Sequence, residues 1–167
     1  MKKLKRVLLF LLILFLLPLG VKAETVTTTL SGGTTVAGGD KIDFTIGIKS
    51  DTNATAFEAA IRYDTNVLEF IGIGKEDKWQ GNNEVRSTGN NTLKFTNAGV
   101  TGESSVATLK FRVKTSNKTS TTVTLDGIKV TLNTKTGEEI KQGDPINKDI
   151  TIKSEDNTLK SIKIDNK

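Results

Sequence analysis

The side chains that could carry chemistry in this sequence are carboxylates, lysines and hydroxyls, because its 167 residues include no cysteine and no histidine. This composition excludes a thiolate nucleophile, a Ser-His-Asp triad, a zinc site of the usual kind and a disulfide. The carboxylates that could act as acid and base are Glu58, Glu69, Glu76, Asp77 and Glu84. A glycosidase needs two of them on opposite sides of a sugar, and their spacing places no pair across a groove. We therefore expect a protein that is not an enzyme.

Two polar segments, 51–55 and 138–144, hold the carboxylate and amide oxygens that calcium prefers. Neither segment has the ligand spacing of a known calcium loop, and the sequence contains no Asp-x-Asn/Asp-x-Asn/Asp-Gly run. We predict no metal site and no bound cofactor.

Trp79 is the single tryptophan and lies in a polar segment with Asp77, Gln80, Asn82 and Asn83. An exposed indole with amide neighbours could stack on one sugar ring, so Trp79 is a candidate glycan-binding residue. Sugar-binding platforms usually need two or three coplanar aromatic rings, and this chain has one tryptophan and one tyrosine. The alternative, which we favour, is that the indole folds back onto the domain and plugs the loop.

The first 23 residues have the pattern of a cleaved secretory signal peptide. Four basic residues open the chain, the apolar run 7–17 follows, and Val21-Lys22-Ala23 offers a cleavage site. The apolar run is too short to span a bilayer comfortably, so we expect no membrane span after the signal is removed. The chain has 24 basic and 19 acidic residues, and five of the basic ones lie in the signal, which leaves 19 minus 19, or zero. This balance argues against a nucleic-acid partner.

The mature chain has the alternation of an all-β protein. Polar and apolar residues alternate with a period of two in 41–49, 57–63 and 105–114. Further strands are expected at 25–30, 67–73, 93–96 and 149–153, with a poor one near 84–87. Segment 121–132 is expected to form one strand or a pair of strands broken at Asp126-Gly127. Eight or nine short strands separated by turn residues favour a β-sandwich. The five phenylalanines outside the signal all fall on these strands, and we expect them in the core.

The segment 57–73 reads as strand, tight corner, strand, with Tyr63-Asp64 at the corner and Val67-Leu68-Glu69-Phe70 after it. This motif resembles the most recognisable one of cohesins and cohesin-like modules, and the strand 107–114 is similar to a late strand of that family. The resemblance covers residues 24–153. It implies a nine-stranded jelly-roll sandwich that binds a partner and does no catalysis.

The resemblance also implies where a partner would bind. Typical cohesins bind dockerins, small calcium-containing helical modules, on one flat sheet face. In this chain that face would carry Glu58, Ala60 and Arg62 from the strand before the corner. Thr92, Lys94 and Thr96 on the short strand could share it. The alternative is that these residues form ordinary solvated sheet surface.

Residues 154–167 look like a linker and the start of a second module. The run 157–164 resembles the opening strand of a cadherin-like β-sandwich repeat in bacterial surface proteins, truncated after one strand. A disordered or locally paired tail is the alternative. We expect a secreted binding module on the surface of a Gram-positive bacterium that attaches a dockerin-like protein. The alternatives are a module that binds polysaccharide or cell-wall glycan and a structural spacer of a surface adhesin.

Overall fold

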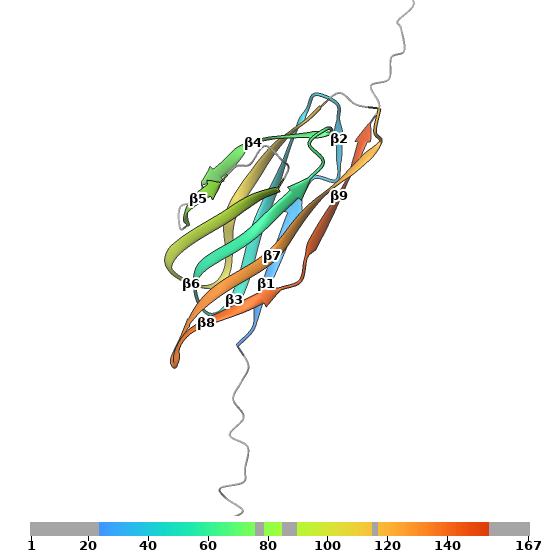
Figure 1. The fold of residues 1–167 in the computed structure, drawn as a ribbon. Coiled ribbons are helices and arrows are strands. Elements are labelled where there is room, and N and C mark those ends of the chain that lie inside the picture. Colours follow the sequence, from blue (N-terminus) through green and yellow to red (C-terminus); the bar gives the residue numbers. More distant parts are fainter. Residues whose placement is uncertain (1–23, 76–78, 85–89, 115–116, 154–167) are drawn as a thin grey trace, which may run out of the picture.

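The computed structural model describes residues 24–75, 79–84, 90–114 and 117–153. The expected signal peptide and the expected second module, 1–23 and 154–167, lie outside the described residues. The described chain is built from nine strands, and none of it forms a helix that could cross a membrane. Figure 1 shows these strands as an elongated sandwich of two layers. The all-β sandwich expected from the alternation and the jelly-roll form that the family resemblance implies are both confirmed.

The strands follow one another without any intervening helix in the described part of the chain. They are β1 Val26–Gly32, β2 Thr35–Ala37, β3 Lys41–Tyr63, β4 Leu68–Lys75, β5 Gln80–Glu84, β6 Asn90–Val113, β7 Ser120–Thr134, β8 Gly137–Gly143 and β9 Ile146–Lys153.

Two long strands, β3 with 23 residues and β6 with 24, connect the layers. The first half of β3 pairs with β1 and with the second half of β6, which in turn pairs with β4. The second half of β3 pairs with the first half of β6 and with β7, and β5 and β8 extend this layer at its two edges. The register of β3 against β6 shifts between Ser50 and Ala56. Such bulges bend a strand and increase its twist, which lets β3 and β6 pass from one layer to the other.

The continuity of these two strands differs from the sequence expectation. Glycine, serine and asparagine gather in segments 50–53 and 97–104, a composition typical of loops, yet these segments lie within β3 and β6 respectively. Gly99 and Gly102 have φ values of +123° and +84°. Glycine adopts such angles without steric cost, so the turn-like residues in β6 build an irregular strand and leave its pairing with β3 in place.

The core lies between the layers and follows the alternation along each strand. Phe44 and Ile46 on the first half of β3 are fully buried. Phe57 and Ile61 on the second half are at most 1% exposed. Phe111 lies at the centre of an aromatic cluster, with ring centroids 5.9 Å from Phe44, 5.1 Å from Tyr63 and 5.2 Å from Phe70. Four of the five phenylalanines are buried, and Phe70 is partly buried against them.

The corner after Tyr63 is fixed by Asp64. Its main-chain carbonyl accepts hydrogen bonds from the N–H groups of Val67 (3.0 Å) and Leu68 (2.8 Å), and its Oδ1 accepts one from Asn66 (2.9 Å). Lys118 donates to Asp64 Oδ2 at 2.7 Å. The Lys118 hydrogen bond, followed by the Asn66 N–H, holds the pKa of Asp64 below its ordinary value of 3.8. The corner that the sequence motif predicted is therefore a hydrogen-bonded turn that connects β3 to β4.

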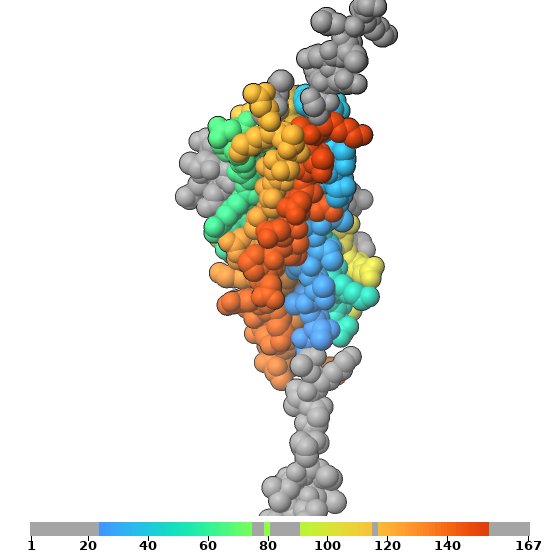
Figure 2. All heavy atoms as spheres, turned by 90° about the vertical axis from the view of Figure 1, so that its right-hand side faces the viewer, coloured from blue at the N-terminus to red at the C-terminus, as the bar shows by residue number. Residues whose placement is uncertain are grey.

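The closing strand β9 completes the sandwich on one side. It pairs with residues 120–125 of β7 and, in parallel, with the short strand β2. Figure 2 shows β9, in red, running beside β1 and β2, in blue. β9 begins at Ile146, three residues before the expected start, and β2 and β8 were not expected as strands.

Candidate protein-binding face

The outer side of the layer β5–β6–β3–β7–β8 carries the residues predicted to bind a partner. Phe57, Ala59 and Ile61 face the core, so the alternate residues of β3 face outward. These are Ala56, Glu58, Ala60 and Arg62. The binding face predicted from the sequence is therefore the outer side of β3, the central strand of this layer.

Glu58 lies between two lysines on this face. Its backbone partner on β6 is Lys94 and its partner on β7 is Lys129. The Lys94 Nζ is 3.7 Å from Glu58 Oε2, and the two side chains are 63% and 42% exposed. Exposed ion pairs contribute at most about 1 kcal/mol to stability. These charges therefore remain available to a partner at little cost to the fold.

Arg62 forms a second charged pair on the same face. Its Nη2 is 2.8 Å from Asp126 Oδ2, on β7. Asp126 stands opposite Ala60, next to a register shift between Glu58 and Ala60, and Gly127 follows it with a φ of +58°. Bulges of this kind change the direction in which neighbouring side chains point. Ala60 places only a methyl group between the two charged pairs.

The structure brings Glu58, Arg62, Lys94 and Thr96 onto one face. Thr96 stands opposite Ala56 and its hydroxyl donates to the Gln80 carbonyl at 3.4 Å. Sequence reasoning missed the contribution of β7, namely Asp126, Lys129 and Thr131. The signal for the last two was present, because Ile128, Val130 and Leu132 alternate with them. What the sequence did not show was that β7 pairs with this half of β3.

Trp79 lies in the interior, so the glycan-stacking hypothesis for it is corrected. Its side chain is 3% exposed and its Nε1–H donates to Ser104 Oγ at 3.1 Å. A ring enclosed in this way offers no face to a sugar. The alternative interpretation, an indole folded back onto the domain, agrees with this position. Its contact with Ser104 on the second half of β6 ties the segment before β5 to the opposite layer.

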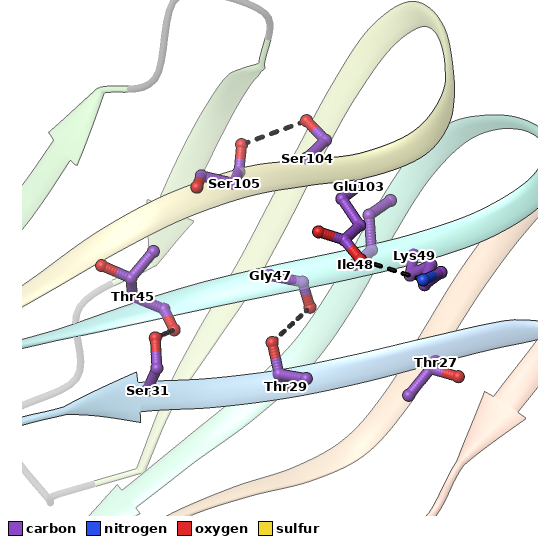
Figure 3. Close-up of a pocket in the computed structure, with 10 residues that line it drawn as sticks. All are labelled: Thr27, Thr29, Ser31, Thr45, Gly47, Ile48, Lys49, Glu103, Ser104 and Ser105. Atoms are coloured by element: carbon purple, nitrogen blue, oxygen red, sulfur yellow. Dashed lines mark hydrogen bonds and ion pairs between the residues drawn. The ribbon is translucent and has the colours of Figure 1, made fainter.

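The opposite layer has a shallow hollow of about 460 Å³ on its outer side, between β1, β3 and β6. Figure 3 shows that threonine and serine hydroxyls line it and that Lys49 and Glu103 pair at one end. Their atoms are 2.9 Å apart, and the hydrogen bond to Glu103 raises the pKa of Lys49. Gly47 is one of the lining residues, and a Cβ there would lie 2.7 Å from Thr29 Oγ1, so a side chain at this position would have to displace Thr29. Its lining contains no aromatic residue.

Within the described ranges no group of three or more acidic side chains could hold a metal ion. The ten residues around the hollow include a single carboxylate, Glu103, and it is already paired with Lys49.

Comparison with known proteins agrees with this architecture. A family model described as the cohesin domain matches residues 26–152. Among solved structures, a cohesin module from a Clostridium perfringens family 33 glycoside hydrolase has a TM-score of 0.66 at 16% identity, covering 80% of this chain and 100% of its own. The seventh ScaB type I cohesin of Pseudobacteroides cellulosolvens has a TM-score of 0.68 at 15% identity, covering 77% and 92%.

A third structure broadens this similarity. A non-cellulosomal cohesin from the archaeon Archaeoglobus fulgidus has a TM-score of 0.61 at 23% identity and covers 78% of this chain and 94% of its own. A type I cohesin–dockerin complex from Clostridium thermocellum has a TM-score of 0.61 at 13% identity, covering 77% and 99%. No curated protein matches the sequence. The matched family model spans the whole sandwich from β1 to β9, and this chain belongs to the cohesin domain family.

Proposed function

We propose that this protein is a non-catalytic attachment module of an exported, cell-surface protein, and that it binds a small partner module of the dockerin type. The observation that carries the proposal is the outer face of the layer around β3. It combines the small side chains of Ala56 and Ala60 with the exposed charges of Glu58, Lys94 and Arg62. A face with small side chains between charges of both signs is suited to a protein partner, because charge complementarity sets orientation and specificity.

The comparisons support the same partner class. One of the similar structures is described as a cohesin bound to a dockerin. The export part of the proposal follows from the pattern of residues 1–23 and predicts a bacterial surface location.

The test is a binding titration of the purified chain against dockerin modules encoded by the same organism. The double variant Glu58→Ala, Arg62→Ala removes one charge of each sign from the face, so the net charge does not change. We expect it to weaken binding at least tenfold. The matched control is Lys49→Ala, Glu103→Ala, which removes an exposed pair from the opposite layer, and we expect it to bind as the unaltered chain does.

Binding that survives in the first variant and fails in the second would place the site on the opposite layer and refute the proposal. Absence of binding to every dockerin would leave the spacer function as the better explanation. Carbohydrate binding is not favoured, because no aromatic side chain of the described residues is fully exposed and Trp79 is buried.

A further inference from the structure

The strand β8 has an unpaired edge in the described part of the chain, where its one hydrogen-bonded neighbour is β7. Figure 1 shows it at the lower border of the molecule. Six of its seven residues are exposed. Ile140, at its centre, is 61% exposed. Among the described residues, the other large hydrophobic side chain that is exposed is Ile71. A flat edge strand with an exposed apolar residue is a template for pairing with another chain.

The sequence of β8 is complementary to itself in one antiparallel register. The two-fold axis of such a pair passes between two directly opposed residues, so the same residue of both copies must meet there. With Ile140 on the axis, Glu139 stands opposite Lys141 twice and Glu138 stands opposite Gln142 twice. Opposite charges directly across from each other stabilise a strand pair.

The neighbouring registers lack this complementarity. Placing Glu138, Glu139 or Lys141 on the axis would oppose two like charges, which destabilises a strand pair. Placing Gln142 on the axis would leave Lys141 facing Gly143 and would shorten the paired segment. The register centred on Ile140 is therefore selected by both charge and apolar contact.

We propose that β8 pairs with β8 of a second copy of this chain, antiparallel and centred on Ile140. In the register of β7 with β8, Ile140 stands opposite Thr131, so its side chain lies on the outer face. Pairing two β8 edges would join the layers of both copies into one continuous sheet with both candidate binding faces on the same side. The contact is small, so the association is weak and depends on concentration. This inference concerns β8 alone and does not depend on the partner proposed above.

The test is sedimentation velocity of the full chain over a dilution series at about 0.15 M salt, where surface charges are screened beyond roughly 8 Å. Glu139→Lys and Lys141→Glu each place like charges opposite each other twice. We expect each to weaken self-association about tenfold or more, since a cross-strand charge pair contributes roughly 0.2–1 kcal/mol and each variant converts two attractions into repulsions.

The decisive sample is the equimolar mixture of these two single variants. Each position of one chain then faces the opposite charge on the other, so the mixture should associate as the unaltered chain does, and the double variant Glu139→Lys, Lys141→Glu should associate alone. Ile71→Thr on the edge strand β4 is the matched control and should change nothing. A chain that stays monomeric at the highest concentration, or a mixture that fails to associate, would overturn the proposal. Association unaffected by either single variant would also overturn it, since the contact would then lie elsewhere.

Discussion

Trp79 offers a test of how the two layers are held together, because it is the single tryptophan of the chain and therefore a specific fluorescence probe. Its indole is 3% exposed and donates a 3.1 Å hydrogen bond to Ser104 across the sandwich. Truncation of a buried aromatic residue to alanine costs about 3–5 kcal/mol. Against the typical 5–15 kcal/mol total for a domain, Trp79→Ala should remove a large part of the stability.

The hydrogen bond can be separated from the packing. Ser104→Ala removes the acceptor and leaves a buried N–H, which costs about 1–3 kcal/mol. Trp79→Phe removes the donor and keeps most of the ring, so its loss of stability should lie between those of Ser104→Ala and Trp79→Ala. Thr96→Ala, at an exposed position of β6, the strand that also carries Ser104, is the control, and its unfolding free energy should stay within about 0.5 kcal/mol of that of the unaltered chain.

The assay is urea unfolding followed by circular dichroism for all variants, with Trp79 fluorescence added where the indole remains. In the folded protein we expect blue-shifted emission and poor quenching by acrylamide, and soluble glycans should leave the emission unchanged. A cost below about 1 kcal/mol for Trp79→Ala would refute the packing argument. A glycan-dependent change in emission would show that the indole is open to ligands.

Three further predictions concern the corner, the bulge and the core. Because the pKa of Asp64 is lowered in the folded state, its contribution to folding stability is present above the unfolded pKa near 3.8 and is lost as the pH falls through the folded pKa. In Asp64→Asn, folding stability should therefore depend less on pH in that range. An unchanged midpoint of acid unfolding would contradict the Lys118 pair. Gly127→Ala should destabilise by about 1–2 kcal/mol because its φ is +58°, and Gly127→Asn by less, measured as a shift in the urea midpoint. Phe111→Ala should cost about 3–5 kcal/mol, whereas an effect under 1 kcal/mol in thermal unfolding would show that the aromatic cluster contributes little.

The sequence alone determined which residues share a side of each strand. A period of two is a local property of the backbone, so Phe57, Ala59 and Ile61 were assigned to the core and Glu58 and Arg62 to the surface without any knowledge of neighbours. The corner was also local, because an aspartate can satisfy N–H groups within four residues of itself. The strand β2 was missed because three residues are too few to show an alternation, and β8 was missed because its mostly polar and exposed residues show none.

Only the tertiary structure decided which strands meet. The pairing of Glu58 with Lys94 and Lys129, and of Arg62 with Asp126, depends on register between strands more than 30 positions apart, and alternation carries no information about register across such distances. The burial of Trp79 also depends on the tertiary structure. Its indole N–H is satisfied in the core because Ser104, on the opposite layer, accepts its hydrogen bond. The composition of a face follows from sequence, whereas the composition of a site follows from which faces the fold sets side by side.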